Sequence, residues 1–279
     1  MNASNTSLKL ENGFLIPDWP ASPHVKALFS TREGGVSAAP FDSLNLGDHV
    51  GDNPADVALN RQLLQTNMAA RPVFLQQVHG TAVVDLTPQT PDGSVADACM
   101  TAHTGVACTI MVADCLPVLF TDVDGSFVAA AHAGWRGLAQ GVLKNTLDAV
   151  NMQFKGHFMP LAGVNVGYNA TKIIAWLGPC IGPTAFEVGD EVRAAFVAQS
   201  ADTALTASQF QAHGAGKWLA NLSGLARLQL QSLGVTNIYG NDGSLPWCTA
   251  TQSSRFFSHR RDAAVLGGSG RMAACVWRV

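Results

Sequence analysis

Two short apolar runs, at residues 117–121 and 127–131, lie on either side of the turn dipeptide Asp124-Gly125. Apolar runs of this length with a turn between them are typical of antiparallel strands joined in a β-hairpin. A hairpin constrains the fold strongly, because its two open ends must lie side by side. We therefore expect the rest of the chain to be arranged around residues 112–137.

The open ends of this hairpin carry Cys115 and His132. A thiolate and an imidazole held together by sheet hydrogen bonds supply half of a zinc site. The best candidate for a third ligand is His79 in the stretch QQVHG, since all three residues are followed within two positions by Gly or Pro and so lie at strand ends. Three protein ligands leave one tetrahedral position open, which is the pattern of a catalytic zinc ion.

Each of these residues also has an ordinary structural interpretation. A single histidine beside an apolar run is more often a hydrogen-bonded core residue than a metal ligand, and only the joint placement of three favours the metal. Asp114, next to Cys115, is a candidate catalytic residue that either orients a ligand or acts as a general base. Its structural alternative is a strand-end carboxylate that accepts backbone N–H groups.

The periodicity of the chain predicts strands that alternate with helices, which indicates the α/β class. Several hairpin-like pairs favour mixed sheets over a purely parallel one. No internal repeat or linker is visible, so we expect one domain over residues 1–279, with irregular stretches at 155–171 and 201–213. Strands are expected at Val25–Ser30, 73–75, 82–86, Val106–Val112, 172–177, 236–239 and 272–276, and helices from Pro54 onwards and at 138–154, 188–198 and 217–233.

The composition excludes several classes of protein. The chain has 279 residues, of which 47% are hydrophobic and 13% charged, so it can bury a sizeable core. A net charge of −3 argues against nucleic-acid and membrane-surface binding. No apolar run approaches the ~20 residues needed to span a membrane. The first residues lack a basic-then-apolar signal pattern, so we expect a cytoplasmic protein.

A long polar stretch at residues 31–53, TREGGVSAAPFDSLNLGDHVGDN, is rich in glycine. A loop of this length inside a compact domain usually has a function. We take its Arg32, Ser43 and Asn45 as candidate substrate-binding residues. The alternative is a surface excursion without a ligand.

Arginines are frequent after residue 250, where the sequence contains five arginines and a single acidic residue, Asp262. The adjacent Arg260 and Arg261 would point to opposite faces of an extended segment, so one could pair with Asp262 while the other faces the interior. An inward arginine near a metal suits a planar anion such as phosphate. Arg136, flanked by glycines, is a further candidate for substrate binding. Structural ion pairing is the alternative for all of them.

Six cysteines are scattered without CxxC spacing, which favours buried thiols or one metal ligand over a disulfide framework. Cys180 in GPCIGP follows a buried strand and is a weaker candidate for a nucleophile. The G-x-S-x-G spacing is absent there and no histidine lies nearby in the sequence.

The chain closely resembles one known family through motifs that occur in order over nearly its whole length. They are STREGGVS, SLNLG, QQVHG, ADCLPVLF, AAHAGWRG, GPCIGP with FEVGDEV, and FFSHRRD with GRMA. This is the YfiH/PgeF family, variously described as laccase-domain multicopper polyphenol oxidases, purine nucleoside phosphorylases and peptidoglycan editing factors. Two departures from the family are His259, where tyrosine is usual, and a longer segment at 262–270.

The resemblance implies that His79, Cys115 and His132 match the family's zinc ligands. It implies an α/β/β/α sandwich with mixed sheets, related to cysteine-dependent toxin deamidases. It also implies phosphorolysis of adenosine, inosine and methylthioadenosine together with deamination of adenosine. The expected partners are a small nucleoside and phosphate. The protein itself is expected to be a monomer or a weak homodimer.

Three other functions remain open at this point. An amidase-like hydrolase that edits peptidoglycan precursors could use the same metal site. A copper polyphenol oxidase is less favoured, because multicopper centres need roughly ten histidines, many in His-x-His pairs. This chain has 8 histidines and no such pair, although copper could occupy the site in vitro. The fourth function is a non-enzymatic binding module in which zinc only stabilises the sheet.

Overall fold

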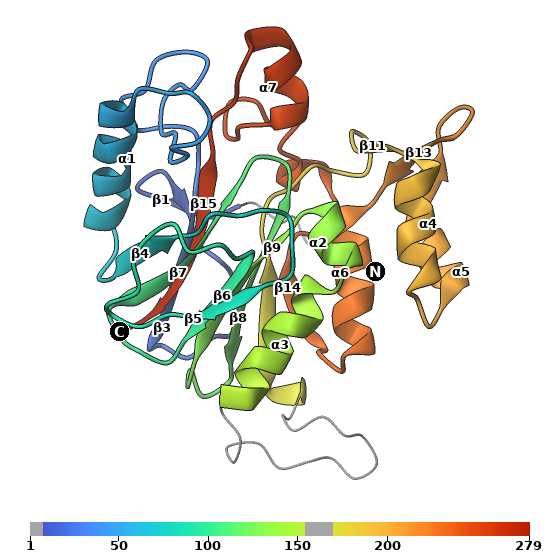
Figure 1. Ribbon diagram of the computed structural model, residues 1–279, viewed down its shortest axis with the longest axis horizontal. Coiled ribbons are helices and arrows are strands. Elements are labelled where there is room, and N and C mark those ends of the chain that lie inside the picture. Colours follow the sequence, from blue (N-terminus) through green and yellow to red (C-terminus); the bar gives the residue numbers. More distant parts are fainter. Residues whose placement is uncertain (1–7, 154–169) are drawn as a thin grey trace.

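A computed structural model describes residues 8–153 and 170–279 and places two six-stranded sheets face to face between layers of helices. Figure 1 shows helix α1 (Pro54–Thr66) covering one outer face, with α3 (Val142–Gln153) and α6 (Leu222–Ser232) on the other. The order of layers is α/β/β/α. The expected fold class, mixed α/β with mixed β-sheets, is therefore confirmed.

The first sheet is antiparallel except at one edge, where β4 runs parallel to β7. Its central strand is contributed by the end of the chain, between strands from near the beginning and from the middle. In spatial order the strands are β1 (Leu10–Glu11), β2 (Phe14–Leu15), β3 (Val25–Ser30), β15 (Met272–Arg278), β7 (Val106–Val112) and β4 (Arg71–Phe74).

The second sheet is mixed, because parallel pairs at both edges flank an antiparallel centre. The predicted hairpin forms that centre. In spatial order the strands are β14 (Asn237–Gly240), β10 (Ile173–Leu177), β8 (Leu116–Asp122), β9 (Val128–Ala133), β6 (Ala98–Thr101) and β5 (Val83–Asp85).

Alternation along the strands divides the apolar residues among three layers of core. On β15, Ala274 and Val276 face the space between the sheets, whereas Cys275 and Trp277 pack under α1. In the second sheet, Val128 and Ala130 of β9 face the first sheet. Side chains on the opposite face of the second sheet pack against α3 and α6. Fully burying a large apolar side chain contributes about 1.5–3 kcal/mol, so these layers hold the sheets together.

The predicted hairpin is confirmed in its strands, its turn and its register. Gly125 takes a left-handed backbone conformation with φ 67°, as the turn requires. Across the open end, Pro117 pairs with His132 and Leu116 with Ala133. Cys115, directly before β8, is therefore held beside the end of β9.

Helix α1 begins as the Asn53-Pro54 sequence predicts. The Asn53 side chain accepts a hydrogen bond from the backbone N–H of Ala55, which caps the helix, and Pro54 occupies its first turn. Val57 and Leu64 are buried beneath the helix, whereas Leu63 is 39% exposed.

The prediction of a single helix over 138–154 is wrong at its N-terminal end, because the structure has two separate helices there. Helix α2 (Trp135–Ala139) begins earlier, and Gly141 with φ 92° separates it from α3. A residue with positive φ cannot continue a right-handed helix, so the chain changes direction at this glycine.

The predictions for 201–213 and for the start of 217–233 are also wrong. The first range contains α5 (Thr203–Ala207) and β12 (Phe210–Ala212), whereas the second opens with β13 (Lys217–Ala220) before α6 begins. Strand β13 pairs with both β12 and β11 (Glu187–Gly189) in a small third sheet, so tertiary pairing overrides local leucine spacing.

The remaining α-helices lie at the right and at the top of Figure 1. Helix α4 (Asp190–Ala198) matches most of the predicted 188–198 helix, and α7 (His259–Leu266) precedes β15. Short 3-10 helices lie at Ala170–Lys172 and Leu245–Trp247. Most of the irregular stretch predicted for 155–171 lies outside the described residues. Among the helices described, none has the length and apolar character to cross a membrane.

Candidate metal centre and the cavity beside it

His79, Cys115 and His132 converge at one end of the two-sheet core. Their ligand atoms all lie within 4.8 Å of one another, and His79 Nε2 is 3.7 Å from Cys115 Sγ. The two imidazole rings meet edge to face, with 4.8 Å between their centroids. His132 is buried, Cys115 is partly exposed and His79 is exposed, so the cluster opens to solvent on one side.

The loop between β4 and β5 presents His79 in an uncommon backbone conformation. Its φ of 60° lies in the left-handed region, which non-glycine residues seldom adopt. The N–H groups of Val78, His79 and Gly80 all donate to the carboxylate of Asp97, at 3.1, 2.9 and 2.7 Å. The same carboxylate therefore fixes the whole turn.

Asp97 also holds His132, because its Oδ1 lies 2.8 Å from His132 Nδ1. Burial by itself would raise the pKa of Asp97, but hydrogen bonds from His132, Gly80 and Val78 lower it, so the group is ionised. The ionised carboxylate makes Nδ1 the protonated nitrogen and leaves Nε2 for the cluster.

The cluster carries a thiolate near neutral pH. Burial would raise the pKa of Cys115, but the neighbouring His132 and His79 lower it to about 6. Burial conversely opposes the charge on His132, whose pKa is raised to about 9 by Cys115 and Asp97. A thiolate is the form of cysteine that binds metal ions, whereas His132 must release its Nε2 proton when a metal ion binds.

Gly134, at the start of α2, leaves room beside the cluster that no other residue would leave. A Cβ at this position would lie 2.9 Å from His79 Cδ2, 3.0 Å from Cys115 Sγ and 3.6 Å from His132 Nε2. Gly137, one turn later, allows α2 to approach the carbonyl of Gly80, which a Cβ would meet at 2.7 Å. The two glycines of HAGWRG thus shape the hollow around the three ligand atoms.

The donor set and its spacing fit a divalent metal ion. Sulfur and imidazole nitrogen are the usual zinc ligands, and tetrahedral bonds of their ordinary lengths separate S from N by about 3.6 Å. The observed 3.7 Å between Cys115 Sγ and His79 Nε2 agrees with that value. Three protein donors with one exposed side leave room for a further ligand.

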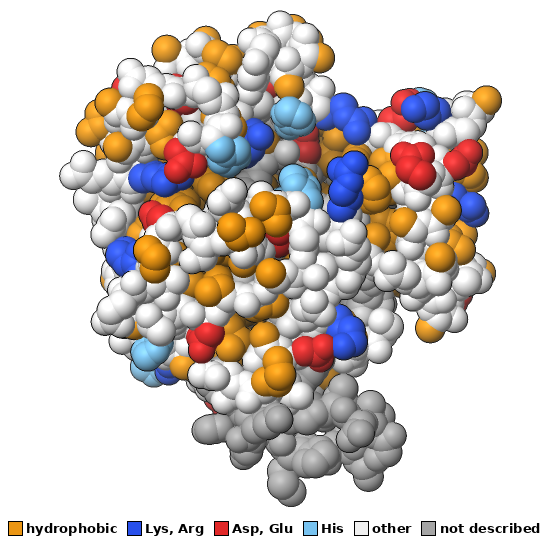
Figure 2. Space-filling model, viewed as in Figure 1, with side chains coloured by type: hydrophobic (Ala, Val, Ile, Leu, Met, Phe, Trp, Pro, Cys, Tyr) orange, Lys and Arg blue, Asp and Glu red, His pale blue; other side chains and the backbone are white. Residues whose placement is uncertain are grey.

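A cavity of about 130 Å³ adjoins Cys115 and has mostly apolar walls. Trp135 of α2 and Phe186 supply aromatic surface, whereas His259 and Arg260 of α7 supply polar groups. On the face of the molecule drawn in Figure 2, histidine and basic side chains gather around a hollow. The remaining lining residues are Ala113, Asp114, Ile181 and Leu222.

Asp114 lines the cavity, but its carboxylate is engaged with the protein. Oδ1 accepts from the Thr249 hydroxyl at 2.6 Å, and Oδ2 accepts from the Ser258 hydroxyl at 3.0 Å and from the Arg260 N–H at 2.7 Å. These contacts match the structural alternative, in which a strand-end carboxylate accepts N–H groups. They attach the C-terminal segment to the metal centre, and a catalytic role for Asp114 stays a prediction.

The two adjacent arginines of α7 have different environments. The premise that they lie on an extended segment is wrong, because both belong to the first turn of a helix capped by Ser258. Arg261 pairs with Asp262 as expected and donates to backbone carbonyls at residues 249, 250 and 256, so it is a structural cross-link. Arg260 lines the cavity and donates to the carbonyl of Glu187 at 3.0 Å.

The candidates from residues 31–53 lie away from this cavity. Arg32 and Ser43 line a different one of about 460 Å³, and Arg32 donates to the carbonyls of Asp42 and Ser253. Asn45 is fully buried, and its side-chain amide forms hydrogen bonds with residues of the same loop. Its Oδ1 also accepts a hydrogen bond from the Arg271 N–H at 2.8 Å. Their contacts organise the loop, and a role in substrate binding stays a prediction.

Arg136 is exposed and lies over the Trp135 ring, 4.4 Å from its centroid. Because Trp135 also lines the cavity, the arginine packs on a wall of the site. A direct contact of Arg136 with a substrate stays a prediction.

Cys180 does not have the environment of a nucleophile. It is 1% exposed, its sulfur accepts from the Asn241 amide at 3.3 Å, and burial together with Cys248 raises its pKa. A thiol that stays protonated is a weak nucleophile, so the structure argues against this alternative.

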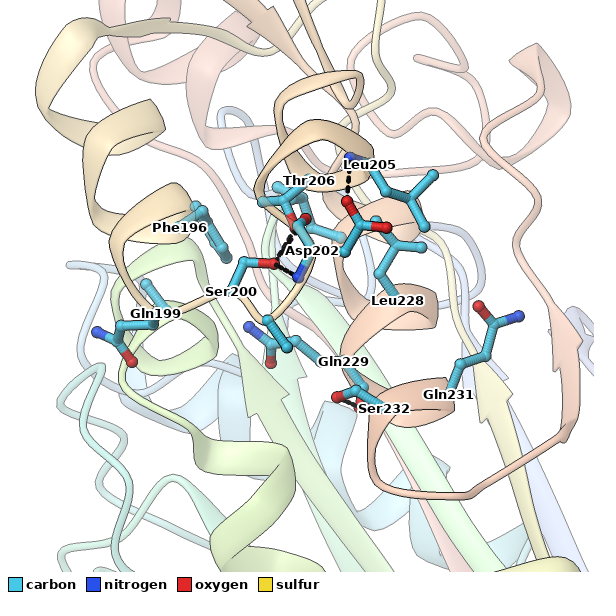
Figure 3. Close-up of a pocket in the computed structure, with 13 residues that line it drawn as sticks. Phe196, Gln199, Ser200, Asp202, Leu205, Thr206, Leu228, Gln229, Gln231 and Ser232 are labelled. Carbon is cyan, nitrogen blue, oxygen red and sulfur yellow. Dashed lines mark hydrogen bonds between the residues drawn. The ribbon is translucent and has the colours of Figure 1, made fainter.

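A larger cavity of about 320 Å³ lies between α4, α5 and α6 (Figure 3). Its polar groups bond mainly to one another: the Ser200 hydroxyl lies 2.7 Å from that of Thr206, and Asp202 caps α5 through the N–H of Leu205. Its lining holds no histidine, cysteine or basic side chain. The cavity beside Cys115 is therefore the better candidate for chemistry.

Two residues of the site were not selected from the sequence. Asp97 carries a signal, because an acidic residue that enters the alanine-rich strand ADACM must be buried and hence paired. Arg271 in GRMA lies close enough for Cys115 and Asp114 to raise its pKa, although burial has the larger effect and lowers it. The sequence does not show that Arg271 lies near Cys115 and Asp114, because this depends on the pairing of β15 with β7.

Comparison with known proteins gives matches over nearly the whole chain. A family model described as multi-copper polyphenol oxidoreductase laccase matches residues 26–279. A protein named purine nucleoside phosphorylase from Pseudomonas aeruginosa is 46% identical over 266 residues, which cover 95% of this chain and 98% of that protein. The purine nucleoside phosphorylase YfiH of Escherichia coli is 45% identical over 267 residues, with the same two coverages.

Solved structures show the same similarity in three dimensions. A Neisseria meningitidis protein is 44% identical and superimposes with a TM-score of 0.81, covering 96% of this chain and 99% of its own. YlmD from Geobacillus stearothermophilus is 31% identical, with a TM-score of 0.84 and coverages of 97% and 98%. These two proteins thus share the fold of this chain over nearly their whole length.

Proposed function

The chain belongs to the multi-copper polyphenol oxidoreductase laccase family, and on that premise we propose that it is a zinc-dependent purine nucleoside phosphorylase. We propose that residues 1–279 form one catalytic domain and that His79, Cys115 and His132 hold the metal ion. The observation that carries the proposal is the opening of this three-donor cluster into an aromatic cavity through Cys115. The names of full-length relatives support the substrate class.

A single metal fits the chain better than a multicopper centre. Among residues 8–153 and 170–279, one group of three or more clustered histidine, cysteine or acidic side chains could hold a metal, and it is this one. Multicopper oxidation requires several ions in neighbouring histidine clusters. A bound divalent ion would supply Lewis acidity at the position that the three donors surround.

The protein's own side chains would bind and orient the two reactants. Trp135 and Phe186 offer flat apolar surface to a purine base, since aromatic rings favour stacked or edge contacts. Arg260 and Arg271 place positive charge near the cluster, where it attracts phosphate. In phosphorolysis a phosphate oxygen bonds to ribose C1′ while the bond from C1′ to the base breaks, so holding both reactants in line lowers the barrier.

We extend the proposal to deamination of adenosine, which needs the same base in the same cavity but no phosphate. The two reactions are separable by their products. Phosphorolysis of adenosine gives adenine and ribose 1-phosphate, whereas deamination consumes water and gives inosine and ammonia.

The test is incubation of zinc-loaded protein with adenosine, inosine or methylthioadenosine, with and without phosphate, followed by chromatography of bases, nucleosides and sugar 1-phosphates. We expect phosphate-dependent release of base, lost in Cys115→Ala. The matched control is Cys275→Ala, which removes a fully buried thiol from the core under α1 and leaves the metal cluster intact. Turnover that is absent in zinc-loaded protein, or equal in both variants, contradicts the proposal.

A copper-loaded sample with a phenol as substrate serves as the rival test. Phenol oxidation faster than nucleoside turnover, abolished by a copper chelator, would replace the proposed function with an oxidase.

A further inference from the structure

One carboxylate connects two of the three proposed metal ligands. Asp97 is fully buried directly before β6, next to β9, and its backbone carbonyl accepts from the His132 N–H at 2.7 Å. Its side chain lies between the His79 turn and the His132 ring. A buried acid requires compensation for its charge, and here it comes from groups at the metal centre.

The carboxylate accepts four hydrogen bonds, two at each oxygen. Oδ1 accepts from the His79 N–H at 2.9 Å and from His132 Nδ1 at 2.8 Å. Oδ2 accepts from the Val78 N–H at 3.1 Å and from the Gly80 N–H at 2.7 Å. Three successive N–H groups around one anion form a backbone nest, and they require the turn that gives His79 its positive φ.

We propose that Asp97 is a positioning residue that places both histidines for metal binding. Through the nest it fixes the backbone that carries His79, and through Nδ1 it fixes the orientation and tautomer of His132, whose Nε2 then faces the cluster. This inference rests on the proposed metal site but not on the proposed substrate. Carboxylates that orient metal-bound histidines in this way change metal affinity by about 10–100-fold when they are replaced.

A purely structural carboxylate would explain the same four hydrogen bonds, so the test must separate folding from metal binding. Asp97→Asn keeps the size of the side chain, but its amide group can accept at only one oxygen and presents N–H towards other donors. The matched control is Asp122→Asn. Asp122 is 1% exposed, lies at the far end of the hairpin and accepts from the Ser126 N–H at 2.7 Å and from its hydroxyl.

The experiment measures zinc affinity by competition with a chromophoric chelator, together with the absorption spectrum of the cobalt-substituted protein. We expect Asp97→Asn to lose about 10–100-fold in zinc affinity and to change the cobalt spectrum. Asp122→Asn should lower the melting temperature and leave both metal readouts unchanged. Wild-type affinity and spectrum in Asp97→Asn would overturn the proposal.

A second measurement needs no variant and therefore holds even if Asp97→Asn does not fold. In zinc-loaded wild-type protein, nitrogen-15 NMR of the histidine rings should show the His132 proton on Nδ1, protected from exchange by Asp97. A proton on Nε2 would contradict the proposal. Because neither readout involves a nucleoside, a protein that binds zinc as expected but does not cleave nucleosides refutes the proposed function alone.

Discussion

Substitution of Gly134 by alanine tests the shape of the metal centre with a single methyl group. The backbone of Gly134 has φ −60° and ψ 154°, which alanine adopts without strain. The new Cβ would lie 2.9 Å from His79 Cδ2 and 3.0 Å from Cys115 Sγ, whereas ordinary contacts between such atoms are about 3.5–4.0 Å. Both ligand side chains must therefore move by about 0.5–1 Å.

Metal bonds tolerate only about 0.2 Å of error, so Gly134→Ala should lose at least about 100-fold in zinc affinity. That loss corresponds to about 2.7 kcal/mol of binding free energy. The free energy of unfolding of the metal-free protein should fall by only about 1 kcal/mol, the usual difference between glycine and alanine at a helix N-cap.

The matched control is Gly189→Ala, because Gly189 is also an N-cap glycine with an ordinary backbone, φ −87° and ψ 176°. The three atoms nearest to its new Cβ all belong to the carboxylate end of the exposed Glu191 side chain, which can turn away. Both variants should melt at similar temperatures without metal, and chelator competition should separate them. Equal zinc affinity in Gly134→Ala and the wild type would refute the geometry described above.

Two further predictions concern the surroundings of the cluster. In metal-free protein the Cys115 thiol has a pKa of about 6 and is therefore mostly a thiolate above pH 6. The rate of its alkylation by iodoacetamide should rise through pH 6 and level off by about pH 8. Peptide mass spectrometry at a series of pH values checks this, and a midpoint near the ordinary thiol value would contradict it; His132→Gln should move the midpoint upward. Asp114→Ala leaves the Thr249 and Ser258 hydroxyls and the Arg260 N–H without their acceptor, so urea unfolding should show a loss of at least about 3 kcal/mol. A loss below about 1 kcal/mol would show that these bonds are easily replaced.

Local patterns predicted the part of the fold that depends on short-range order. The turn dipeptide Asp124-Gly125 set the register of the hairpin, and that register brings Cys115 beside His132. His79 joins them from the loop between β4 and β5 rather than from a strand end as expected, because β4 already stops at Phe74. The sequence alone therefore identifies the three residues of the cluster.

Long-range pairing determined what the sequence did not predict. Residues 217–220 have a leucine-rich helical neighbourhood but form a strand, because two other strands flank them. Arg271 reaches the site only because β15 inserts between β3 and β7. Asp97 carries a local signal, a carboxylate directly before a buried strand, but its four partners come from two other segments of the chain.

The central claim is that one metal ion is held by two imidazoles and one thiolate with a position left for a substrate. Crystallography of zinc-loaded protein with anomalous scattering at the zinc edge tests it most directly. The prediction is a single zinc ion bonded to His79, Cys115 and His132, with a water or substrate atom as the fourth ligand. A fourth protein ligand, or a zinc ion bound elsewhere, would contradict the account.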